Sequence, residues 1–212
     1  MNYRKSIFDD SPDLYEAWFK RNHHIFDNEL KAIKQLLPCF EKGIEVGIGA
    51  GIFASALGIK EGVEPSATMS ARAKDKGIHV IHAHAEELPI TGGTYDFVLM
   101  VTVDCFLKDV VLAFKEVRRI LSAGGFFIVA FIDRATTLGE KYELKKVSNE
   151  FYRHANFHSA EEMIHFLQEA GFEIIEKRQT IFSLENINQD IRDGVGEGVF
   201  AVIKVKKPDF AR

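Results

Sequence analysis

The sequence has few cysteines and no long apolar segment. Of its 212 residues only two are cysteines, Cys39 and Cys105, and they form no CxxC pair. A disulfide scaffold is therefore excluded, and two reduced cysteines are expected rather than a single disulfide. The longest apolar run, residues 126–132, is far too short to cross a bilayer, and the N-terminus lacks the apolar stretch of a secretory signal. The sequence predicts a soluble, cytoplasmic protein with no membrane span.

An excess of basic residues is also absent. The chain carries 27 Lys and Arg against 31 Asp and Glu, a formal net charge of −4. Proteins that bind nucleic acid usually carry a basic footprint, so this function is disfavoured. The chain does contain 46% hydrophobic residues, including 18 Phe, which is enough for a sizeable core. We expect one domain spanning residues 1–212.

The first part of the chain has a broken helical pattern. Apolar residues recur through residues 12–37, but their spacing is interrupted around residues 22–28. This predicts two helices with a joint at the interruption, ended by Pro38. We interpret residues 1–38 as an N-terminal helical cap.

From residue 43 onward, short apolar runs alternate with helical patterns. Strands are expected over residues 43–47, 61–64, 78–81, 95–101, 126–132, 172–182 and 199–205. Helices are expected over residues 52–57, 65–76, 110–121 and 159–170. The alternation predicts an α/β fold: a three-layer, Rossmann-like sheet, mostly parallel, with helices on both faces. The last strand is expected to run antiparallel, because no helical pattern precedes it, and residues 133–158 form a long insertion.

The first predicted strand leads into a turn that is rich in glycine. It reads Glu45-Val46-Gly47-Ile48-Gly49-Ala50-Gly51. Glycines let the chain turn sharply and let a ligand approach backbone amides. The turn fits the dinucleotide motif G-x-G-x-x-G poorly, because Ile52 occupies the third glycine position.

Two carboxylates accompany this turn. Glu45 would repel a pyrophosphate and attract a ligand with an ammonium or sulfonium centre. Glu64 ends the second predicted strand, where an acid can accept hydrogen bonds from both ribose hydroxyls. Together they favour a cationic nucleoside as the ligand.

Further segments follow in a fixed order along the chain. They are Gly62-Val63-Glu64-Pro65-Ser66, Ala85-Glu86-Glu87-Leu88-Pro89-Ile90, Tyr95-Asp96-Phe97-Val98, residues 116–125 and Ala170-Gly171-Phe172. With these segments the chain resembles the class I S-adenosylmethionine-dependent methyltransferases. Within them it looks like the small-molecule branch that includes the ubiquinone and menaquinone biosynthesis enzymes. The resemblance covers residues 40–132 closely and residues 157–205 more loosely.

The resemblance implies a set of residues that bind S-adenosylmethionine. Glycines of the turn would cradle the methionine part, Glu64 would bind the ribose, and residues after it would pack on the adenine. The family usually has Asp-Ala where this chain has His84-Ala85, so the Ala85 backbone and the Glu86 side chain are the substitutes. The full predicted set is Glu45, Gly47, Gly49, Gly51, Glu64, Pro65, Met69, Ala85, Glu86, Val101 and Thr102.

Catalytic and metal-binding residues are less evident. Asp104 follows the fourth predicted strand and is the candidate general base, with a loop-capping role as the alternative. His154 and His158 have i, i+4 spacing, but no well-placed Cys or acid completes a site, so no metal is predicted. Two other functions stay open, a nicotinamide-dependent oxidoreductase and an S-adenosylmethionine-binding protein without transferase activity.

A small molecule is the expected methyl acceptor. After the fourth strand the chain reads Val101-Thr102-Val103-Asp104, which lacks the prolines of amino-nucleobase and cytosine-C5 methyltransferases. The acceptor pocket is expected beneath the N-terminal helices and the insertion, which both carry aromatic residues. These are Tyr15, Trp18, Phe19, Phe26, Tyr142, Phe151, Tyr152 and Phe157. They predict an apolar or aromatic acceptor.

Overall fold

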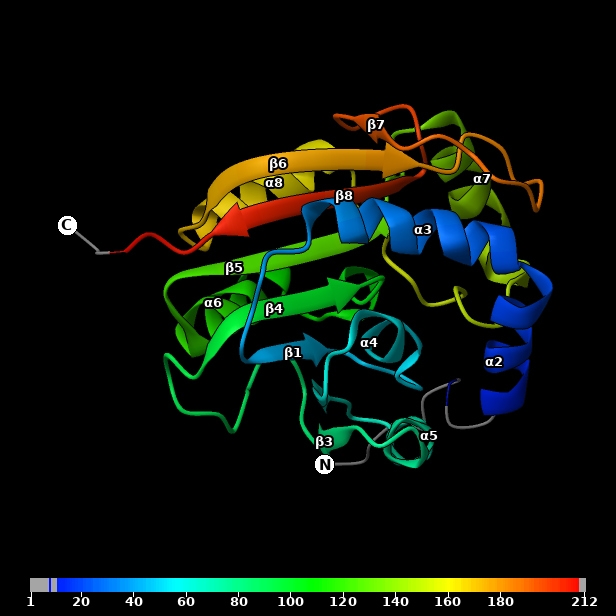
Figure 1. Cartoon of the computed structure of the whole chain (residues 1–212). Helices are drawn as coiled ribbons and strands as arrows, with labels where there is room; N and C mark the ends of the chain where they lie inside the picture. Colours follow the sequence, from blue (N-terminus) through cyan, green and yellow to red (C-terminus); the bar gives the residue numbers. More distant parts are fainter. Residues whose placement is uncertain (1–7, 9–10, 210–212) are drawn as a thin grey trace.

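The computed structural model describes Phe8 and residues 11–209 of the chain. These residues form an eight-stranded sheet with the order β3-β2-β1-β4-β5-β8-β6-β7 (Figure 1). The strands are β1 (Gly43–Val46), β2 (Glu61–Val63), β3 (His79–Ile81), β4 (Tyr95–Val101), β5 (Leu121–Ile132), β6 (Glu173–Thr180), β7 (Arg192–Asp193) and β8 (Phe200–Lys206). β1 to β5 pair in parallel, whereas β8 pairs antiparallel with both β5 and β6. The predicted mixed sheet with an antiparallel last strand is confirmed.

Helices cover both faces of this sheet. They are α2 (Pro12–Arg21), α3 (His23–Leu36), α4 (Ile52–Leu57), α5 (Ala67–Asp75), α6 (Val110–Ile120), α7 (Thr137–Lys145) and α8 (Ala160–Glu169). One core lies between the sheet and α3, α4 and α5. A second core lies between the opposite face and α6 and α8. The β4 side chains alternate between the two cores, as expected for a strand covered on both faces.

The joint between the two N-terminal helices is shorter than predicted. Only Asn22 separates α2 from α3, and its side-chain amide donates to the Trp18 carbonyl at 2.9 Å. The interruption at residues 22–28 includes Asn28, which is buried and bonds to the backbone of Ile187 and Gln189. The prediction of a long joint was wrong. The polar side chain of Asn28, which lies within α3, makes a tertiary contact and does not mark a helix end.

The start of one strand also differs from prediction, and the insertion contains regular structure. β5 begins at Leu121 rather than Phe126, and its pairing with β4 shifts register between Tyr95 and Phe97. The insertion of residues 133–158 contains α7 and the short 3₁₀ helix η2 (Lys146–Ser148). It is therefore ordered structure at the sheet edge.

The carboxyl edge of the parallel strands carries the elements that matter for function. Helix α2 lies on the side to which the arrowheads of β1 and β4 point, and α7 lies on the same side of the sheet (Figure 1). In α/β sheets of this kind, ligands bind at the carboxyl ends of the strands. The fold therefore places the N-terminal helices and the insertion over the expected ligand edge.

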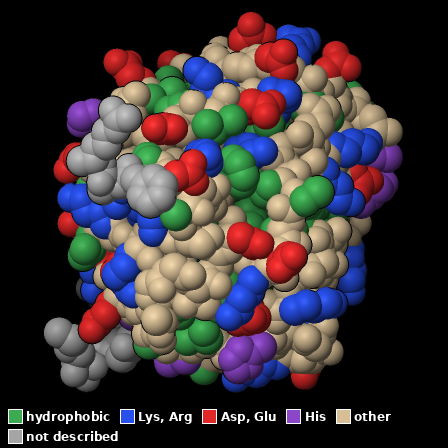
Figure 2. Space-filling model, turned by 60° about the vertical axis from the view of Figure 1, so that its left-hand side comes forward, with side chains coloured by type: hydrophobic (Ala, Val, Ile, Leu, Met, Phe, Trp, Pro, Cys, Tyr) green, Lys and Arg blue, Asp and Glu red, His purple; other side chains and the backbone are tan. Residues whose placement is uncertain are grey.

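One face of the molecule shows how the charged side chains are distributed. On the face shown in Figure 2, acidic and basic side chains are interspersed. No helix among the described residues is long and apolar enough to cross a membrane.

Candidate cofactor and acceptor site

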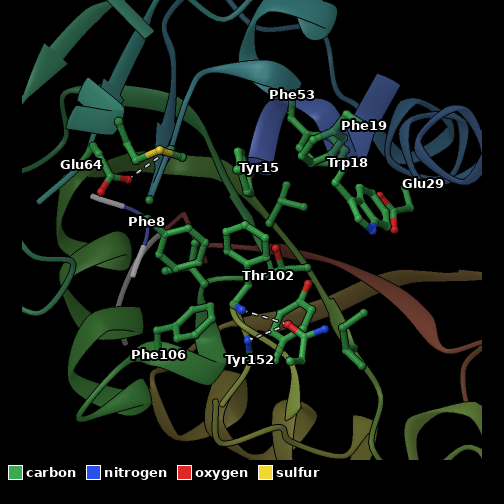
Figure 3. A pocket seen from close by; sticks show the side chains of 18 of the residues that line it. Phe8, Tyr15, Trp18, Phe19, Glu29, Phe53, Glu64, Thr102, Phe106 and Tyr152 are labelled. Carbon is green, nitrogen blue, oxygen red and sulfur yellow. Dashed lines mark hydrogen bonds between the residues drawn. The ribbon is translucent and has the colours of Figure 1, made fainter. Parts of the chain in front are cut away.

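A cavity of about 320 Å³ opens at the carboxyl edge of the sheet. This volume is in the range of small-ligand pockets. Its wall combines the glycine turn, the ends of β2 and β4, helices α2 and α3, and the insertion (Figure 3). The lining residues are Phe8, Tyr15, Trp18, Phe19, Glu29, Gly47, Gly49, Phe53, Glu64, Pro65, Met69, Val101, Thr102, Val103, Phe106, Ile132, Tyr142, Asn149, Phe151 and Tyr152.

The three glycines of the turn have different surroundings. All have positive φ, a conformation that favours glycine. A Cβ on Gly47 would lie 2.3 Å from Val103 Cγ2, and one on Gly51 would lie 2.6 Å from Ile78 Cδ1. At Gly49 the nearest atoms would be 3.6 Å away. Gly47 and Gly49 line the cavity, whereas Gly51 lets α4 pack closely on its neighbours.

Glu64 is held rigidly at one end of the cavity. Its carboxylate accepts hydrogen bonds from the backbone N–H of Gly49 at 2.9 Å and of Ser66 at 2.8 Å. Ser66 in turn caps α5 by accepting from Met69 N–H. One acid therefore ties the glycine turn to the start of the next helix, and its side chain is 8% exposed.

Glu45 lies behind the glycine turn, outside the cavity wall. It is 2% exposed, and its Oε2 has no hydrogen-bond partner among the described residues. Burial raises the pKa of this carboxyl well above its usual value, and the neighbouring Glu64 raises it further. Glu45 therefore does not line the cavity, and its role beside the ligand stays a prediction.

Thr102 ends β4 in a strained conformation. Its φ is 52°, a rare value for a β-branched residue, and such outliers cluster at functional sites. Its N–H still donates to the Ala130 carbonyl at 2.7 Å. The strained residue lies where the chain turns after β4. At this turn Val101, Thr102 and Val103 form part of the cavity wall.

Not all predicted cofactor residues meet at the cavity. Pro65 and Met69 line it together with Gly47, Gly49, Glu64, Val101 and Thr102. Ala85 is packed in the core that faces α6, and the Glu86 carboxylate accepts from Lys108 N–H at 2.9 Å. Neither belongs to the described cavity wall, and His84 is exposed.

Aromatic rings form much of the remaining wall. They come from the N-terminal region, α4, the segment after β4 and the insertion: Phe8, Tyr15, Trp18, Phe19, Phe53, Phe106, Tyr142, Phe151 and Tyr152. Phe8 stacks on Phe151 with centroids 5.6 Å apart, which joins the N-terminal region to the insertion. Six of the eight aromatic residues expected in the acceptor pocket line the cavity. Phe26 and Phe157 instead pack in the core.

Glu29 is a lining residue that the sequence did not suggest. It lies on α3, is 9% exposed, and faces the cavity at the end opposite to Glu64 (Figure 3). Burial raises the pKa of its carboxyl to about 8. No local pattern distinguishes it from a solvent-facing helix residue, so its position depends on how α3 packs.

Asp104, the candidate general base, contacts a buried histidine through Oδ2, whereas its buried Oδ1 has no hydrogen-bond partner among the described residues. Its carboxylate lies 3.0 Å from His158 Nδ1, and both side chains are buried. Burial raises the Asp104 pKa, and the hydrogen bond from His158 opposes that shift. The two residues connect η1 (Asp104–Phe106) to the segment before α8. Asp104 does not line the cavity, whereas Phe106 of the same 3₁₀ helix does.

We therefore expect Asp104→Asn to affect stability more than ligand binding. The substitution removes the charged partner of a buried imidazole, which costs about 1–3 kcal/mol of unfolding free energy. Urea denaturation measures that loss, and titration with S-adenosylhomocysteine should give an unchanged dissociation constant. A variant of normal stability that loses methyl transfer would restore Asp104 as the general base.

Metal ligands do not gather in the part of the chain that the structure describes: it holds no group of three or more His, Cys, Asp or Glu side chains arranged for a metal ion. His158, one of the predicted i, i+4 pair, is bonded to Asp104.

Comparisons with known proteins identify the family. A family model described as "Methyltransferase domain" matches residues 44–129. A solved structure from Thermotoga maritima is 41% identical, with 95% of this chain and 98% of that chain covered and a TM-score of 0.91. It is described as an S-adenosylmethionine-dependent methyltransferase, possible histamine N-methyltransferase. This chain belongs to the S-adenosylmethionine-dependent methyltransferases.

Other relatives extend the family without adding an activity. An uncharacterized protein of Methanocaldococcus jannaschii is 39% identical over 95% of this chain and 99% of its own length. An uncharacterized protein of Mycobacterium tuberculosis is 30% identical over 86% of this chain and 68% of its own length. The methyltransferase family makes S-adenosylmethionine the cofactor, as predicted, and the nicotinamide alternative finds no support.

Proposed function

We propose that this methyltransferase transfers the methyl group of S-adenosylmethionine to a small-molecule acceptor by direct in-line displacement. The observation that carries the proposal is the composition of the cavity. One end holds the glycine turn and Glu64, and the remainder is mostly an aromatic wall to which α2 and the insertion contribute the largest share. Donor and acceptor would therefore share one enclosed space.

The donor end suits a cationic nucleoside. Glu64 would accept hydrogen bonds from the ribose, while Gly47 and Gly49 would let the methionine part approach the backbone. Glu45 would face the positive charge of the donor from behind the turn. When bound, S-adenosylmethionine supplies an electrophilic methyl group on a sulfonium.

The aromatic wall suits an apolar or aromatic acceptor. Rings attract cations and stack on other rings, so they would hold a flat acceptor beside the donor and exclude water. Correct orientation of two reactants is worth roughly 7–11 kcal/mol of the barrier, so positioning can supply much of the catalysis. The description of the Thermotoga relative as a possible histamine N-methyltransferase agrees with a small acceptor.

A binding protein without transferase activity is the competing function. The absence of an assigned general base leaves room for it, but an aromatic wall that extends beyond the donor end has no purpose in a donor-binding protein. The net charge of −4 and the mixed charges on the face shown in Figure 2 give no support to a nucleic-acid acceptor.

Transfer of a labelled methyl group tests the proposed function. Purified protein is incubated with S-adenosylmethionine carrying a trideuterated methyl group and with pooled small-molecule metabolites. We expect a product that is heavier by the labelled methyl group, and its absence when the donor is unlabelled or the protein is boiled. Tight donor binding with no labelled product from any pool would favour the binding protein.

A further inference from the structure

Glu29 is a buried carboxylate that faces the cavity and has no polar partner within the part of the chain that the structure describes. It is 9% exposed and lies on α3 among lining residues that are otherwise mostly aromatic. Within the described residues, no hydrogen bond or ion pair joins its carboxylate to another side chain or to the backbone. An unpaired buried charge is costly, so such groups are either neutral or paired with a ligand.

The surroundings of Glu29 specify what that ligand group is. Its titratable neighbours are the phenols of Tyr15, Tyr142 and Tyr152, whose pKa values are raised mainly by burial and further by the charge of Glu29. Figure 3 shows Glu29 beside Trp18 at one end of the cavity, with Glu64 at the other. A carboxylate in a cavity lined by aromatic side chains attracts a cation by its charge, and the rings add cation–π attraction. It repels a carboxylate or phosphate.

Building on the proposed function, we propose that Glu29 binds the ammonium group of an amine acceptor, with the aromatic wall enclosing the apolar part of that molecule. Glu29 is then a specificity-determining residue of the acceptor side. Glu29 and Glu64 lie at opposite ends of the cavity. The cationic donor would therefore bind near Glu64 and the cationic acceptor near Glu29. The raised pKa of Glu29 is consistent with a group that releases its proton only when a cation replaces it.

Three matched probes test this role. 2-Phenylethylamine, 2-phenylethanol and phenylacetate have the same ring and differ in charge. Each is titrated calorimetrically into protein saturated with S-adenosylhomocysteine. We expect the amine to bind at least about tenfold more tightly than the alcohol, because a charge-assisted hydrogen bond contributes at least that much. The acid should bind least.

The variant Glu29→Gln keeps the shape and removes the charge. We expect its preference for the amine over the alcohol to fall to within about twofold, while its affinity for S-adenosylhomocysteine stays unchanged. Glu16→Gln, on the neighbouring α2 and outside the cavity wall, should behave as the unaltered protein does.

The outcomes separate this inference from the proposed function. Failure of the unaltered protein to bind S-adenosylhomocysteine would contradict the proposed function itself. Normal donor binding with no preference for the amine, or with the preference kept in Glu29→Gln, would overturn only the role of Glu29. A loss of S-adenosylhomocysteine affinity in Glu29→Gln would place Glu29 on the donor side and also overturn it.

Discussion

Replacement of Glu64 by alanine should weaken binding of S-adenosylhomocysteine by roughly 10- to 100-fold, because hydrogen bonds to a charged group contribute about 1.5–3 kcal/mol. The same carboxylate holds the N–H groups of Gly49 and Ser66, so the substitution also loosens the glycine turn and the start of α5. Calorimetric titration gives the dissociation constant directly.

A control on the same strand makes this result specific. Glu61 is also on β2, but its carboxylate accepts a hydrogen bond from the Tyr95 hydroxyl and lies outside the cavity wall. Glu61→Ala should therefore keep the donor affinity of the unaltered protein. An unchanged dissociation constant in Glu64→Ala would mean that the donor binds elsewhere.

Replacement of Glu29 by glutamine should stabilise the ligand-free protein at alkaline pH. Burial raises the Glu29 pKa from 4.5 to about 8, so the folded state binds this proton more tightly than the unfolded state does. The free energy of unfolding therefore falls as pH rises from about 4.5 through 8, by an amount of order 3–5 kcal/mol. Burial also raises the pKa of Tyr142, to about 12, so this neighbour stays neutral throughout that range.

Thermal unfolding at two pH values measures this effect. At pH 5 the variant and the unaltered protein should melt at similar temperatures. At pH 8.5 the variant should melt higher, by roughly 2–4 °C for each kcal/mol. Glu173→Gln, on an exposed residue of β6, should change neither melting temperature. Parallel behaviour of Glu29→Gln and the unaltered protein across this range would show that Glu29 is not a buried neutral carboxyl.

The prediction of the donor side rests on local features of the sequence. The glycine turn and Glu64 lie within one strand–turn–helix–strand unit, so their spacing along the chain fixes their spacing in the fold. The alternation of strands and helices likewise predicted the sheet. Three points stay predictions. They are the membership in the branch of ubiquinone and menaquinone enzymes, the division of the chain into caps and core, and the roles of the individual site residues.

The residues of the acceptor side are brought together by contacts between segments that lie far apart in the sequence, so local patterns could not predict them. Glu29 faces the cavity only because α3 packs across the sheet, and nothing within the helix distinguishes it from an exposed acid. The same holds for Asp104, since the loop residue and its partner His158 are 54 positions apart. Asn28 looked like a helix interruption because its partners, Ile187 and Gln189, lie far along the chain.

A crystal structure of the protein with bound S-adenosylhomocysteine tests the division of the cavity most directly. We predict that the ribose contacts the Glu64 carboxylate and that the sulfur points toward the aromatic wall, with space left between it and Glu29. The account is contradicted if the homocysteine part fills the space at Glu29, or if the ligand binds away from the glycine turn.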